Sequence, residues 1–172
     1  MADVGAFLAR RRVALGAACA LVALVLARPT WMWWSIGLAV AVVGEGLRVW
    51  AAGHLEKNRE VTTSGPYRWM RHPLYIGSAL MAVGVVIAVR EPFVGFLAMI
   101  YFATTVPAAI RNEEMHLRRT FGDLYERYAR DQAPRVARRF SVERAVRNKE
   151  YRAVAGLAAG FALLALRIRL HL

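Results

Sequence analysis

Cysteine is nearly missing from this sequence. Cys19 is the only one among 172 residues, and it lies within an apolar run. A single thiol excludes a disulfide framework and a metal site built on paired cysteines, so we interpret Cys19 as a small buried apolar residue. The sequence also lacks internal repeats, and it lacks low-complexity segments apart from an alanine-rich tail.

Acidic residues are scarce relative to basic ones. The chain carries 12 Asp and Glu against 24 Lys and Arg, which gives a formal net charge of +12. Such an excess is typical of nucleic-acid-binding proteins when it forms a stripe on a soluble fold. Here the arginines stand in blocks between apolar runs, as in cytoplasmic loops beside anionic lipid. We therefore exclude a nucleic-acid partner and expect a membrane.

Apolar residues, by contrast, are plentiful and make up 58 % of the chain. The length suits one domain, which we take as residues 1–172. The apolar residues gather in runs of membrane-spanning length, although the last run is also suited to lying in the interface. The sequence therefore predicts an all-α, polytopic membrane helix bundle of about five transmembrane helices, over residues 5–27, 31–52, 74–89, 93–110 and 151–172.

The N-terminus imitates a signal peptide, because three arginines at positions 10–12 precede an apolar stretch at 13–27. Residues 28–30 lead directly into another apolar segment, so we expect an uncleaved first span. The positive-inside rule places the N-terminus in the cytoplasm together with the polar segments 53–73 and 111–150. We thus expect an integral, multi-pass membrane protein.

Two ionisable residues, Glu45 and Arg48, fall inside the second apolar segment. They are three residues apart and therefore neighbours on one helical face. Groups of this kind at membrane depth usually pair and face the protein interior or a wet cavity. The pair either locks helix packing or lines a reaction cavity. Gly44 and Gly46 flank the glutamate, where we expect another backbone to approach closely.

Polar chemistry gathers at the border of the third apolar segment, over residues 65–77. Pro73 suits the first turn of a helix and pushes His72 toward an extended backbone. The helix then directs its N-terminus, with unpaired amides and partial positive charge, at the level of Arg71 and His72. This arrangement suits an anionic or nucleotide-like ligand.

The period changes after residue 110 to that of an amphipathic helix. Glu114, Phe121, Tyr125 and Tyr128 fall on one face at 100° per residue. Gly122 lies within this pattern, where a glycine is unfavourable, so we expect close packing there. Upstream, proline 107 is expected to kink the fourth apolar segment.

Two motifs stand out in the sequence. The first is Gly65-Pro66-Tyr67-x-x-x-Arg71-His72-Pro73-x-Tyr75-x-Gly77, and the second is Glu113-Glu114-x-x-Leu117-x-x-x-Phe121-Gly122-x-x-Tyr125-x-x-Tyr128. Together they resemble the isoprenylcysteine carboxyl methyltransferase family and its phospholipid methyltransferase relatives. The resemblance covers a core of about residues 44–135. The Pro134-Arg135 pair also matches, but a second proline that usually follows is absent, which leaves the placement of residues 136–150 open.

The resemblance implies an integral membrane enzyme that uses S-adenosylmethionine, needs no metal and acts on a lipid or lipidated substrate. It implies catalytic roles for Arg71 and Glu114. The residues expected to bind the cofactor are Tyr67, His72, Leu74, Tyr75, Gly77, Glu113 and Glu114. Those expected in the substrate cavity are Glu45, Arg48, Tyr125, Tyr128 and Arg135. Which glutamate touches the donor stays open, although the stripe favours Glu114.

Other functions remain open at this point. Sterol reductases that use NADPH end in a similar Arg-His-Pro-x-Tyr-x-Gly arrangement, but they usually carry Asn at the position of Leu74 and lack the second motif. A non-catalytic scaffold or small transporter on the same helices is the other alternative. The chemical class of the methyl acceptor, whether carboxylate, thiol or amine, is also open. So is the placement of residues 151–172, a helix beyond the family-like core that either spans the membrane or lies in the interface.

Overall fold

The computed structural model describes the backbone of residues 2–170 and the side chains of residues 14–170. Regular structure in this part of the chain is helical throughout, and no strand occurs there, which confirms the predicted fold class. The elements are α1 (Ala2–Leu26), α2 (Trp31–Ala52), the 3₁₀ helix η1 (Gly65–Arg68), α3 (Pro73–Val89), α4 (Pro92–Phe121), α5 (Asp123–Ala129), α6 (Val142–Arg147) and α7 (Tyr151–Arg169).

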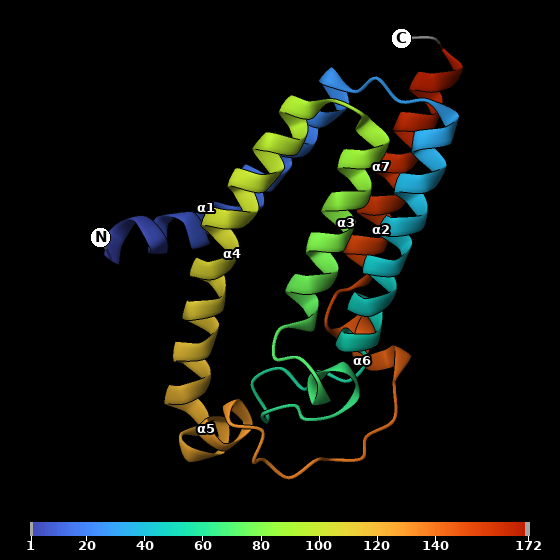
Figure 1. The fold of residues 1–172 in the computed structure, drawn as a ribbon. Helices are drawn as coiled ribbons and strands as arrows, with labels where there is room; N and C mark the ends of the chain where they lie inside the picture. Colours follow the sequence, from blue (N-terminus) through green and yellow to red (C-terminus); the bar gives the residue numbers. More distant parts are fainter. Residues whose placement is uncertain (1, 171–172) are drawn as a thin grey trace.

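The long helices form one bundle that consists of two groups. Helices α2, α3 and α7 lie side by side, and α1 packs against α4 beside them (Figure 1). The end of α2, the start of α3, and helices α5 and α6 gather at one end of the bundle (Figure 1). The polar segments 53–73 and 122–150 therefore share one end, and the turn at 90–92 lies at the other.

Helices α2 and α3 pack with their backbones nearly touching. A Cβ atom on Gly44 would lie 2.6 Å from the carbonyl oxygen of Gly77, and one on Gly84 would lie 2.5 Å from the carbonyl oxygen of Gly37. Small residues let membrane helices approach in this way. The close approach predicted at Gly44 is confirmed. The one predicted at Gly46 is wrong, because a Cβ there would meet nothing within 4 Å.

Helix α7 belongs to the bundle. Phe161 and Leu164 join a buried apolar cluster with Ala41 of α2 and Ala88 of α3. The indole nitrogen of Trp34 donates a hydrogen bond of 2.9 Å to the carbonyl oxygen of Phe161. This packing disfavours the alternative in which residues 151–172 lie in the membrane interface. Residues 171 and 172 lie outside the described chain.

Within the described residues, three helices are long and apolar enough to cross a membrane, and they are α2, α4 and α7. Helix α3 and the stretch Ala14–Leu26 of α1 are apolar but shorter. The side chains at positions 10–12, on which the orientation of the N-terminus rests, lie outside the described residues. The structure is thus a membrane helix bundle, and an apolar helix lies at each of the five spans that the sequence predicts.

The predicted amphipathic helix is not a separate element. Helix α4 runs unbroken through Pro107 to Phe121, and it changes direction partway along (Figure 1). Glu113 and Glu114 therefore lie well inside a long helix. The chain then turns at Gly122, whose φ of +50° favours glycine, and a Cβ there would meet nothing within 4 Å. The close packing expected at Gly122 is wrong: this glycine separates α4 from α5.

Candidate active site

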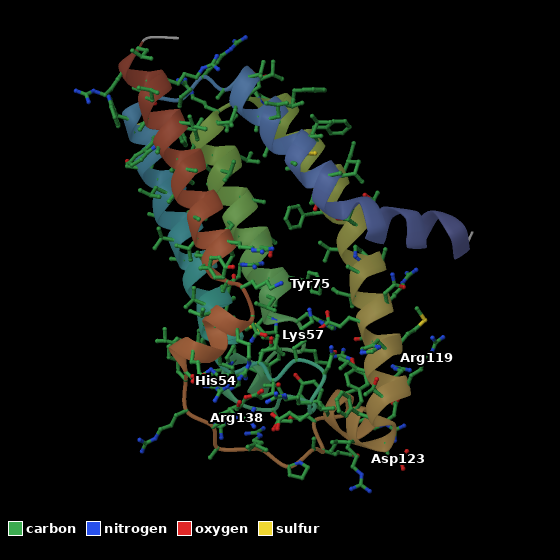
Figure 2. All side chains as sticks on the ribbon, turned by 180° about the vertical axis from the view of Figure 1, so that it is seen from behind. His54, Lys57, Tyr75, Arg119, Asp123 and Arg138 are labelled. Atoms are coloured by element: carbon green, nitrogen blue, oxygen red, sulfur yellow. The ribbon has the colours of Figure 1, made fainter. Side chains whose placement is uncertain are left out.

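A cavity of about 820 Å³ opens at the polar end of the bundle. Its wall comes from the end of α2, the loop after it, the first turns of α3, one face of α4, helix α5, Asn148 and Glu150. Figure 2 shows polar side chains gathered at this end, with Lys57 and Tyr75 on the side of α3 that faces α4. The two sequence motifs thus border one space.

The start of α3 lies where the sequence predicts, but the extended backbone predicted for His72 is wrong, because its ψ of 55° falls short of the extended region. Pro73 is the first helical residue, and His72 before it has φ −130° and ψ 55°. The carbonyl oxygen of His72 accepts hydrogen bonds from the amides of Tyr75 and Ile76. Because Pro73 has no N–H, the amide of Leu74 is the donor left in the first turn to face a ligand.

A direct contact joins the two motifs. His72 Nε2 lies 3.1 Å from Glu114 Oε1, and Arg71 Nη1 lies 3.6 Å from the same oxygen. The side chains of His72 and Glu114 are only 15 % and 22 % exposed, which makes this contact stronger than a surface pair. Glu114 therefore fixes both motif residues that precede α3.

Three tyrosines brace the cavity beside this contact. The hydroxyl of Tyr128 donates a 2.9 Å hydrogen bond to the carbonyl oxygen of Tyr67. Tyr125 is 1 % exposed, and burial, then the Glu114 carboxylate, raise its pKa to about 12. Burial also raises the pKa of Tyr67 and of Tyr128. All three hydroxyls are therefore neutral donors near pH 7.

Most of the predicted site residues line the cavity. Those that do are Arg48, Tyr67, Arg71, His72, Leu74, Tyr75, Glu113, Tyr125 and Tyr128. Between the two glutamates, Glu113 borders the space, whereas Glu114 lies behind it and holds Arg71 and His72. The sequence pattern favoured Glu114 for the contact with a ligand, and the geometry favours Glu113.

The remaining predicted residues lie outside the cavity wall. Gly77 packs between α3 and α2, where an added Cβ would lie 2.6 Å from Arg48 Cγ. Glu45 is buried, and neither carboxylate oxygen has a hydrogen-bond partner among the described residues. Arg135 is exposed and pairs with Asp131 at 3.7 Å. None of these three residues meets the main cavity directly.

Sequence reasoning missed several polar residues of the wall. Asn112 and His116 stand one turn apart on α4 next to Glu113, and helical spacing from that glutamate was a signal that could have found them. Asn148 and Glu150 also line the cavity, but they come from residues 136–150, outside the resembling region. No local pattern indicated that they return to the site.

Ion pairs hold this returning segment against the loop after α2. Glu56 accepts from Arg144 and Arg147, each at 2.9 Å, and Glu60 pairs with Arg138. The side-chain amide of Asn148 donates to the backbone carbonyl oxygens of residues 52 and 55. The placement that the sequence left open is thus beside the cavity.

Ligands for a metal do not gather in the described part of the chain: no group of three or more His, Cys, Asp or Glu side chains occurs there. The polar groups that line the cavity are instead hydroxyl, amide, guanidinium, ammonium, imidazole and carboxylate groups. Such a set suits an organic ligand with several polar groups.

Comparisons with known proteins agree with the motifs. A family model described as phospholipid methyltransferase matches residues 11–124. The cobalt-zinc-cadmium resistance protein CzcN of Cupriavidus metallidurans is 36 % identical over 97 residues, 55 % of this chain and 43 % of that relative. A probable protein-S-isoprenylcysteine O-methyltransferase of Oryza sativa subsp. indica is 34 % identical over 110 residues, 55 % of this chain and 56 % of the relative.

The human protein-S-isoprenylcysteine O-methyltransferase is 33 % identical over 113 residues, 56 % of this chain and 38 % of the relative. The chain thus spans about half or less of the length of these relatives. No solved structure matches it. The matched residues include both motifs up to the start of α5, and the segment that carries Asn148 and Glu150 lies beyond them.

Proposed function

The chain belongs to the phospholipid methyltransferase family, and from this premise we propose that it is an integral membrane methyltransferase. It transfers a methyl group from S-adenosylmethionine to a lipid-like or lipidated substrate. The observation that carries the proposal is the contact of 3.1 Å between His72 and Glu114. It joins the two motifs beside a single cavity, although two long helices separate them in the chain.

The residues around the cavity fit this methyl donor. About 820 Å³ is near the upper end of the roughly 300–1,000 Å³ of small-molecule sites, so the cavity has room for the donor and the reacting end of an acceptor. Glu113 is placed for the ribose hydroxyls or the amine. Arg71, His72 and the Leu74 amide are placed for the carboxylate. Tyr67 and Tyr75 supply aromatic faces for the adenine.

The chemistry asks the protein for alignment and exclusion of water. When bound, the donor supplies an electrophilic methyl group on a sulfonium sulfur, which keeps the bonding electrons. A carboxylate acceptor is already nucleophilic and needs only to be positioned. An amine or thiol must also lose a proton, and for such an acceptor neutral His72, held by Glu114, serves as the base while Arg71 and the Leu74 amide hold the donor carboxylate.

We assign the side of the cavity toward the bilayer to the substrate. Tyr101, Phe102 and Val106 of α4 give it an apolar wall at the depth of the membrane-spanning helices. We propose that a lipid chain enters laterally along this wall and that the donor enters from the polar end, which we assign to the cytoplasm. The names of the plant and human relatives point to an isoprenylated cysteine, and the family description points to a phospholipid.

Calorimetry on the detergent-solubilised protein tests the proposal. Titration with S-adenosylmethionine should give saturable binding to one site, and titration with NADPH should give none. Binding of NADPH without S-adenosylmethionine would overturn the methyltransferase assignment in favour of a membrane reductase. Binding of neither would indicate a non-catalytic membrane protein.

A further inference from the structure

The cavity has a second charged group in its wall, deeper in the bundle than His72. Arg48 of α2 and Glu150, which immediately precedes α7, both line the cavity, and their side chains are 21 % and 7 % exposed. Ser78 of α3 belongs to the same group. It lies six residues after His72, which is about 9 Å along a helix at 1.5 Å per residue. The two charged groups therefore occupy different depths of one cavity.

The guanidinium of Arg48 is held along one edge. Its Nε donates to Glu150 Oε1 at 2.7 Å, and its Nη1 donates to Ser78 Oγ and, at 3.4 Å, to the carbonyl oxygen of Leu74. Two separate parts of the chain, α3 and the residue before α7, thus fix one side chain. A guanidinium carries five N–H groups in a rigid fork, so the two on Nη2 remain to face a ligand.

Glu45 does not take up those remaining donors. Its nearest approach to the guanidinium is 3.7 Å, from Oε2 to Nε, and its oxygens accept no hydrogen bond among the described residues. Glu150 is therefore the carboxylate that sets the orientation of Arg48. A charge at membrane depth is costly without such a partner, and Glu150 supplies one where the cavity meets the bundle core.

Resting on the proposed function, we propose that Arg48, positioned by Glu150, binds the oxyanion of the methyl acceptor. Both acceptor classes carry one: a lipidated cysteine has its carboxylate, and a phospholipid has its phosphodiester. A planar guanidinium suits either group, because its paired N–H donors match two acceptor oxygens. The apolar wall of Tyr101 and Phe102 lies on the same cavity, where the lipid part of the acceptor would sit.

This inference gives a role to the segment beyond the family match. The matched region ends at residue 124, and Glu150 comes 26 residues later. A buried ion pair is often no more stabilising than apolar residues of the same volume, so packing alone does not explain a charged pair in the cavity wall. Glu150 acts as a positioning residue for the acceptor site, whereas the donor site is complete without it.

Methyl-transfer kinetics on the full-length protein test this role. Labelled methyl transfer is measured to phosphatidylethanolamine vesicles and, separately, to farnesylcysteine with a free carboxylate. Glu150→Gln should raise the KM of the acceptor that the parent uses by about 10-fold, the size of one lost charged hydrogen bond, and leave donor affinity unchanged. Glu150→Asp, which keeps the charge, should restore part of the loss. Glu143→Gln, exposed in the same segment, should behave like the parent.

The two acceptors identify the source of the oxyanion, and the donor measurement separates this inference from the proposed function. An unchanged acceptor KM in Glu150→Gln would overturn the positioning role, and so would an equal loss of donor affinity. If that variant does not fold, Arg48→Lys keeps the charge without the fork and should show the same rise in KM. A parent that binds donor but methylates neither acceptor would overturn the acceptor site alone. A parent that binds no donor would overturn the proposed function.

Discussion

Removing either partner of the His72 and Glu114 contact should weaken donor binding. The contact is 3.1 Å long, and both side chains are mostly buried, so its loss resembles the loss of a charge-assisted hydrogen bond. Such a loss costs about 1.5–3 kcal/mol, or roughly 10- to 150-fold in affinity. We therefore expect His72→Ala and Glu114→Ala each to raise the Kd for S-adenosylmethionine by roughly 10- to 150-fold, measured by calorimetry in detergent.

The two effects should not add. Glu114 lies behind the cavity wall and reaches a ligand only through His72 and Arg71, so most of its contribution disappears once the histidine is gone. The double variant should bind about as weakly as the weaker single variant, with a coupling energy of about 0.5–3 kcal/mol. Glu143→Ala, on an exposed position, should bind like the parent. Strictly additive losses, or parental affinity in both single variants, would refute the idea that the two motifs form one donor site.

Further predictions concern packing and topology. Gly84→Leu should lower the thermal midpoint by several degrees or prevent folding, because its side chain would enter the backbone of α2, whereas Gly46→Leu should be tolerated; equal effects would contradict the packing described. Gly122→Ala should destabilise the protein by about 1 kcal/mol in chemical unfolding, since alanine resists a positive φ, and a neutral effect would count against the turn. In a cysteine-free background, Lys57→Cys should react with impermeant reagents from the cytoplasm and Arg90→Cys from outside. Labelling of both from one side would rule out the assigned topology.

Much of the bundle could be predicted because its signals are local. Apolar runs mark the helices, and Pro73 marks the start of α3. The close packing of α2 against α3 could be predicted in part, since Gly44 is next to a charged residue in an apolar helix. Eight of the nine predicted residues in the cavity wall likewise lie within the two motifs, and the ninth, Arg48, was marked by its charge inside an apolar segment.

The remaining features depend on contacts that spacing does not encode. Gly122 fits a helical period, and only its backbone angle shows that the helix ends there. Which of Glu113 and Glu114 borders the cavity depends on how α4 is rotated against α3. Glu150 reaches Arg48 across 102 residues of chain, and no motif marks that approach. Long-range ion pairs of this kind become visible only in the folded structure.

Methyl transfer itself tests the central claim most directly. Membranes that contain the protein are incubated with S-adenosylmethionine labelled on its methyl group, and label is counted in the extracted lipids and lipidated cysteines. We expect incorporation by the parent and by Glu143→Ala, and its loss in the His72→Ala, Glu114→Ala double variant. Absence of incorporation by a folded parent that binds the donor, or full incorporation by a folded double variant, would contradict the claim.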